Sequence, residues 1–312
     1  MVGDMEHFCA SLGLESYNSL EMCPWCEANT TTAPWTEFSK VRPERTGWPG
    51  PVGDRRPFLL LTGVTRLSIA ADLLHVVDLG VASYLVGGTL SSLYHEAGNP
   101  KEFLGDLWIK IQEGYRAVEG PSKSRMDFWG PSSFLKNPKS PGADWPKWRG
   151  KGAETRHFVP ALLYAVASLP GQTSPFAKLR RKALEHMAAF YFELEPHRAA
   201  QQLPPAAARA LKHHSAALLK AYSELSMTQE GLFYNVAPKM HYLTHLVTQS
   251  QFTNPLQTHC YGEEDVVGKM VKVSKAAALG HSQAQVSLAV LSRYRVLLAL
   301  RWGGHLGLEE NS

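Results

Sequence analysis

The chain has 312 residues, which suffices for one large domain or two modest ones, and 44% of them are hydrophobic. A formal net charge of +4 permits nucleic acid as a partner without requiring one. Four cysteines are too few for a disulfide framework at this length, which excludes a small disulfide-rich secreted protein. Since neither a run of about 18 apolar residues nor a signal peptide is recognisable, we expect an intracellular protein without a membrane span.

Hydrophobic spacing predicts a mainly α-helical protein, because strand signals are scarce along the chain. A short amphipathic helix over 5–14 is followed by a loop over 15–58 that is rich in Pro, Trp, Thr and Gly. Apolar residues at helical spacing then predict helices over 64–95 and 100–118.

The segment 120–157 differs in character, since it combines five prolines with many basic residues and three tryptophans. We expect an exposed basic loop, with Lys147, Arg149 and Lys151 as candidate DNA contacts. Basic and aromatic side chains together suit phosphates and unstacked bases. The alternative is a solvated linker whose tryptophans pack onto the body of the protein.

Helices are predicted to resume after this segment. They are expected over 158–170, 175–195 and 204–227, from Pro238 through the histidine pair described next, and over 262–279 and 282–302.

Two residue pairs have the spacing of a zinc site. Cys23-Pro-Trp-Cys26 is a knuckle that supplies half of a tetrahedral set, and His241 and His245 point the same way on a helix. Together they predict one structural zinc ion that joins the ends of a large insertion. A thioredoxin-type redox motif would need a strand before the knuckle, where the sequence is polar and turn-like. Tyr242 stands where a zincin-type metalloprotease would need its glutamate.

Carboxylates flank both halves of this zinc site and suggest a second site for magnesium. Asp4 lies 19 residues before Cys23, and Glu264 lies 19 residues after His245, with Glu263 as its rival. Magnesium prefers hard oxygen ligands, and two-metal phosphoryl transfer uses carboxylates from separate segments. The alternative role for the acidic run at 263–265 is to favour the start of a helix.

Asp72 and His75 form a further pair, one helical turn apart. They predict either support for a metal or DNA contact, or a helix-start carboxylate beside a buried histidine.

In this order, the motifs resemble the eukaryotic cut-and-paste DDE transposases of the CACTA-like and Transib-like group. That resemblance implies an RNase H-like α/β core with Asp, Asp and Glu, interrupted by a helical zinc-binding insertion. It implies that Asp4 is the second catalytic Asp, that Glu264 is the catalytic Glu, and that Asp72 and His75 match an accessory DxxH element. Zinc would be structural, Mg²⁺ or Mn²⁺ catalytic, and DNA the partner, with Lys269 and Lys272 as further contacts.

The resemblance also implies an organisation and a location. Residues 1–14 would be a remnant of the core, 15–250 the insertion, and 251–312 the C-terminal helices that carry the Glu. The first Asp and the opening strands would lie before residue 1, so we expect a fragment or a decayed copy that is inactive alone. It would be nuclear, with a homodimer on transposon ends as its assembly and no small-molecule substrate.

Two other functions fit the same residues. One is a non-catalytic, zinc-stabilised helical module that binds nucleic acid or protein. The other is a zinc hydrolase that uses the Cys/His site directly, which requires an open coordination position.

Overall fold

The computed structural model describes residues 2–3, 5–45, 48, 57–118, 124–126, 129–136, 144–228 and 233–261, together with short stretches between 271 and 296. The chain divides into two compact units, 1–259 and 260–312. The helices and strands that are labelled below all lie in the first unit.

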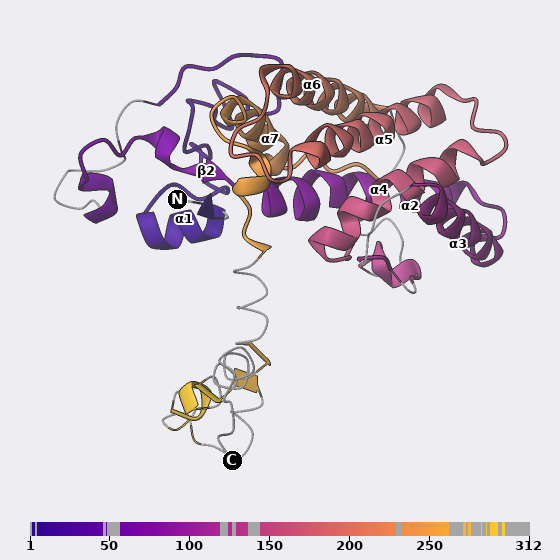
Figure 1. Cartoon of the computed structure of the whole chain (residues 1–312). Helices are drawn as coiled ribbons and strands as arrows, with labels where there is room; N and C mark the ends of the chain where they lie inside the picture. Colours follow the sequence, from indigo (N-terminus) through magenta and orange to yellow (C-terminus); the bar gives the residue numbers. More distant parts are fainter. Residues whose placement is uncertain are drawn as a thin grey trace. The chain divides into compact units, whose positions relative to one another are not determined.

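The described part of the chain is mainly helical, as the sequence predicts (Figure 1). Its α-helices are α1 (Met5–Leu12), α2 (Ala82–Glu96), α3 (Pro100–Ala117), α4 (Gly152–Ala167), α5 (Pro175–Leu194), α6 (Pro205–Met227) and α7 (Pro238–Gln249). A π-helix, η4 (Leu74–Val81), leads directly into α2. Short 3₁₀ helices are η2 (Pro57–Leu60), η3 (Arg66–Ser68), η5 (Pro131–Ser133), η6 (Glu195–His197) and η7 (Pro255–Gln257).

Several helices begin at a proline or at a side chain that caps the first turn. Proline stands first in α3, α5, α6 and α7, where the missing N–H has no intrahelical acceptor in any case. The side chain of Asn99 accepts from the backbone of α3, and Ser174 does the same for α5. The start of the histidine-bearing helix at Pro238 is therefore readable from the sequence.

The core forms where these helices pack on one another. In Figure 1, α5 and α6 run side by side, and α3 lies against α4. Gly114 allows the close approach of α3 to α4, because a Cβ there would lie 2.6 Å from the backbone oxygen of Ala161.

Within the described residues, one helical stretch, Leu74–Glu96, is long and apolar enough to cross a membrane by length and composition. Its apolar window is 89% buried inside the protein, as in a core helix.

Two short strands form a parallel pair beside this core. Strand β1 (Val2–Gly3) pairs with β2 (Ala70–Ala71), with Val2 opposite Ala70 and Gly3 opposite Ala71. Because the strands are parallel, their carboxyl ends lie at the same edge.

The helix predicted over 64–95 begins later than expected. Residues 66–68 form η3 and residues 70–71 form β2, and the long helix starts only at Leu74. The cause is Asp72, whose carboxylate oxygens accept the backbone N–H groups of Leu74 and His75 at 3.0 and 3.3 Å. A side chain that caps a helix start in this way ends the preceding extended segment.

The basic segment predicted as a loop over 120–157 is also shorter, because α4 already begins at Gly152. The carboxylate of Glu154 accepts the backbone N–H of Lys151 at 2.8 Å and so stabilises the first turn. Trp148 is buried and stacks on Phe158 at 4.3 Å, while Trp145 is 44% exposed. For Trp148, packing onto the body is the correct alternative.

Candidate metal centre

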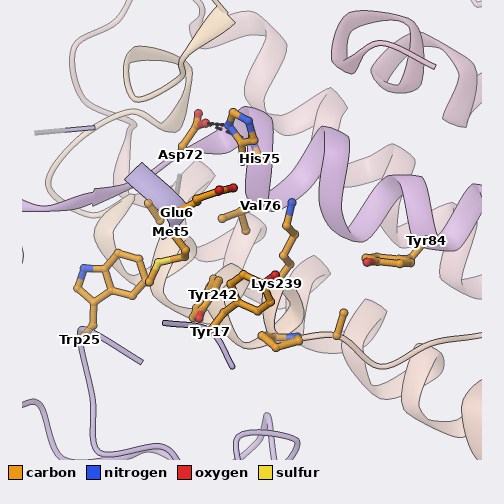
Figure 2. Close-up of a pocket in the computed structure, with 13 residues that line it drawn as sticks. Met5, Glu6, Tyr17, Trp25, Asp72, His75, Val76, Tyr84, Lys239 and Tyr242 are labelled. Carbon is orange, nitrogen blue, oxygen red and sulfur yellow. Dashed lines mark hydrogen bonds and ion pairs between the residues drawn. The ribbon is translucent and has the colours of Figure 1, made fainter. Parts of the chain in front are cut away.

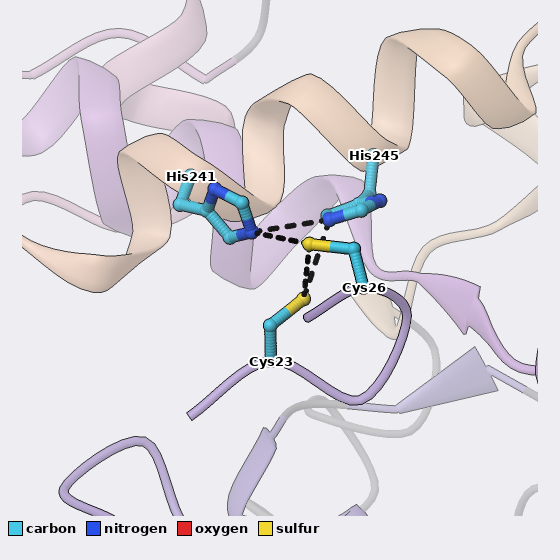
Figure 3. A group of neighbouring side chains, drawn as sticks. All are labelled: Cys23, Cys26, His241 and His245. Atoms are coloured by element: carbon cyan, nitrogen blue, oxygen red, sulfur yellow. Dashed lines mark hydrogen bonds between the residues drawn. The ribbon is translucent and has the colours of Figure 1, made fainter. Parts of the chain in front are cut away.

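The structure brings together all four residues predicted as zinc ligands. Cys23 and Cys26 lie on the loop after α1, and His241 and His245 lie one turn apart on α7. Their ligand atoms all fall within 4.8 Å of one another, and Figure 3 shows the four side chains converging. Among the described residues, this is the group whose donor atoms are close enough to hold one metal ion.

The distances within the group match a tetrahedral sphere. Zinc bonds of about 2.3 Å to sulfur and 2.0–2.1 Å to nitrogen imply S–S, S–N and N–N edges of about 3.8, 3.5 and 3.3 Å. The two sulfurs are 3.7 Å apart, and the two Nε2 atoms are 3.1 Å apart. Cys23 lies 3.2 Å from His245, and Cys26 lies 3.4 Å from His241. The site can therefore hold a metal ion, and its dimensions are compatible with structural zinc.

The electrostatics of the four groups favour a cation. Burial raises the pKa of the Cys23 thiol, whereas the contact with Cys23 and then those with the histidines lower the pKa of Cys26 to about 2. Cys26 therefore ionises before Cys23, and a bound divalent cation would stabilise both sulfurs as thiolates. Burial lowers the pKa of His241, which keeps its ring neutral and suited to coordination at pH 7.

Two arginines donate hydrogen bonds to the backbone of the Cys23–Cys26 knuckle. Nε of Arg45 donates to the carbonyl oxygens of Cys23 and Cys26 at 2.9 and 2.8 Å. Arg66 donates to the carbonyl oxygen of Pro24 between them. Charged donors thus fix the carbonyls of the loop that carries the two sulfurs. Neither arginine has a sequence spacing that could have predicted this role.

Aromatic residues anchor the same loop to α7 and to the segment just before β2. The hydroxyl of Tyr242 donates to the carbonyl of Met22 at 2.8 Å, just before the knuckle. The indole of Trp25, inside the knuckle, donates to the carbonyl of Ile69 at 2.9 Å. Tyr242 therefore ties α7 to the cysteine loop at the position where a zincin would carry its catalytic glutamate.

Asp72 and His75 also meet, as their spacing predicts. Nδ1 of His75 is paired with the carboxylate of Asp72, which is 1% exposed and caps the following helix. Both residues line a cavity of about 270 Å³, together with Glu6 and Lys239 (Figure 2). The expected helix-start role of Asp72 is confirmed, and the pair also faces a space large enough for a small group.

The acidic candidates for magnesium cannot be located in the same way. Asp4, Glu263 and Glu264 lie outside the described residues, as does Lys269. Lys272 is described and exposed in the second unit.

The basic candidates of the Pro- and Trp-rich segment differ from one another. Lys147 is half-buried, with its ammonium 5.1 Å from the ring centre of Tyr84, and burial lowers its pKa. Arg149 and Lys151 are exposed. These two therefore keep the accessibility that contact with phosphate requires, while Lys147 contributes to packing.

Four protein donors complete a tetrahedral set, as structural zinc sites do, and this argues against a hydrolase that needs an open position.

Comparisons with protein-family models, curated proteins and solved structures found no match for this chain. The chemical interpretation of the centre therefore rests on the geometry of its own residues.

Proposed function

We propose that the chain is part of a metal-dependent, DNA-processing protein of the DDE transposase type, with a structural zinc ion at Cys23, Cys26, His241 and His245. The observation that carries the proposal is that cysteines and histidines far apart in the chain meet at this centre. Cys26 and His241 are 215 residues apart, and Cys23 and His245 are 222 residues apart. The intervening chain is mainly helical. A zinc-binding helical insertion is one of the features that the resemblance implies.

The strand pair supports the same proposal. In the chain, β1 is followed directly by Asp4 and β2 directly by Asp72. The carboxyl ends of parallel strands are where α/β sheets place ligand-binding groups. A candidate catalytic aspartate that follows one of these strands is consistent with an RNase H-like core.

In this proposal, Asp4 and Glu264 hold the catalytic Mg²⁺ or Mn²⁺. The bound ions would activate the attacking oxygen and stabilise the leaving oxygen in phosphodiester cleavage and strand transfer. His75, oriented by Asp72, lines the cavity beside the strand ends and would position a phosphate or a water molecule there. As a eukaryotic DNA-processing protein it would act in the nucleus, with two copies on the transposon ends.

The proposal is tested by nicking of supercoiled plasmid DNA in Mn²⁺ or Mg²⁺, with a protein extended upstream through the first Asp, because the 312-residue chain is expected to be inactive alone. We expect Asp4→Asn and Glu264→Gln to abolish metal-dependent nicking while both variants retain zinc. Glu263→Gln is the matched control and should remain active. Absence of nicking by the extended wild-type protein, or unchanged nicking in both variants, would contradict the proposal.

The second candidate is a non-catalytic, zinc-stabilised module that binds nucleic acid. It is favoured by the fact that the zinc centre is complete without either magnesium carboxylate. DNA binding without any metal-dependent nicking would support this candidate over the enzyme.

A further inference from the structure

A cavity of about 690 Å³ lies directly beside the metal centre, which contributes Cys26, His241 and His245 to its lining. Its volume is within the range of ligand-binding pockets. Five basic side chains line it: Lys40, Arg42, Arg45, Arg66 and Lys212. Among the described lining residues, Glu44 is the one acidic side chain.

The arginines of this cavity are held in fixed positions. Arg42 donates to the carbonyl of Pro34 at 2.7 Å and to Glu37 at 2.8 Å, and its side chain is 13% exposed. Arg45 is 14% exposed and is held by the knuckle carbonyls and by Glu21. A guanidinium has five N–H donors, so each group can keep these contacts and still donate to a ligand.

Two lysines supply further charge from different elements. Lys40 comes from the loop after the knuckle, and its side chain is 60% exposed. Lys212 is exposed on α6, whose neighbour α7 carries the metal-ligating histidines. Even with Glu21 and Glu37 added to Glu44, cations outnumber anions around the cavity.

We propose that this cavity binds the phosphate backbone of DNA. The inference rests on the proposed DNA-processing function and names the surface that would contact the substrate. Fixed guanidinium groups suit phosphate, because their planar donors match its oxygens in pairs. The metal centre would then also contribute to DNA binding. The hydrogen bonds from Arg45 to the carbonyls of Cys23 and Cys26 hold its guanidinium in position for a phosphate.

The proposal predicts a specific pattern of DNA binding. We expect Lys40→Glu and Lys212→Glu each to weaken binding of a fluorescent oligonucleotide several-fold, and the double variant to weaken it about tenfold or more. The slope of log affinity against log salt should become shallower by about one for each phosphate that is no longer neutralised. Lys220→Glu is the matched control, because Lys220 is exposed on the same helix and does not line the cavity.

The experiment is fluorescence anisotropy at several salt concentrations, with single-stranded and duplex oligonucleotides and with inorganic phosphate as competitor. Zinc content is measured for every variant to establish that the fold is kept. Wild-type affinity in the double variant, or an equal loss in Lys220→Glu, would overturn the cavity assignment and leave the proposed function standing. Failure of the wild-type protein to bind either oligonucleotide would overturn both. Displacement of DNA by phosphate at low concentration would show a site for free phosphate instead.

Discussion

Replacing Cys26 by serine removes one sulfur from the metal centre while almost preserving side-chain size. Cys26 is 2% exposed, and its Sγ lies 3.7 Å from that of Cys23 and 3.4 Å from Nε2 of His241. A serine hydroxyl does not ionise at neutral pH, so the site would lose one of its two thiolates. We therefore expect Cys26→Ser to lose zinc.

The size of the effect follows from the length of chain that the centre closes. The contact between Cys26 and His241 joins residues 215 apart. Loop-closure entropy for a cross-link of that length is about 5 kcal/mol at room temperature. Domains of ordinary stability unfold at a cost of about 5–15 kcal/mol. Loss of the metal should therefore remove at least a third of the free energy of unfolding and leave about 0–10 kcal/mol.

The assay combines zinc analysis with urea unfolding followed by circular dichroism. The wild-type protein should carry one zinc per chain, and chelation should shift its unfolding midpoint to that of Cys26→Ser. Cys260→Ser is the control, since this thiol lies outside the cluster, and it should retain zinc and stability. Full zinc content in Cys26→Ser, or loss of zinc without any change in unfolding, would refute the reasoning.

Three further predictions concern the helical core and its titration. Gly114→Ala should destabilise the protein by about 1–3 kcal/mol in urea unfolding, because the added Cβ would strike the backbone of α4. The exposed control Gly105→Ala should stabilise the protein by up to about 1 kcal/mol, and equal effects of the two variants would contradict the prediction. Arg156→Met should cost about 3–5 kcal/mol, since it removes the cation 2.9 Å from the buried carboxylate of Asp78, and a negligible loss would argue against the pair. Burial and a neighbouring histidine lower the pKa of His186. The free energy of unfolding should therefore fall as the pH drops below about 6.5, and it should fall less steeply in His186→Gln. Identical pH profiles of unfolding in the two proteins would contradict this.

Local sequence chemistry predicted the parts of this protein that depend on neighbouring residues. Pro238 marks the start of α7, and four-residue spacing places His241 and His245 on one face of it. The spacing of Asp72 and His75 likewise predicted their contact. The late start of the long helix was missed because a capping carboxylate and a helix-interior carboxylate are indistinguishable by periodicity alone.

What the sequence by itself determined is the set of four metal donors and the helical character, because both follow from residue type and short spacing. Only the tertiary structure decided what surrounds that centre. Arg45 and Arg66 reach the knuckle carbonyls, and Lys212 comes to line the same cavity from a helix far along the chain. Such contacts depend on how loops and helices pack, and side-chain charge alone does not reveal which of many basic residues will converge.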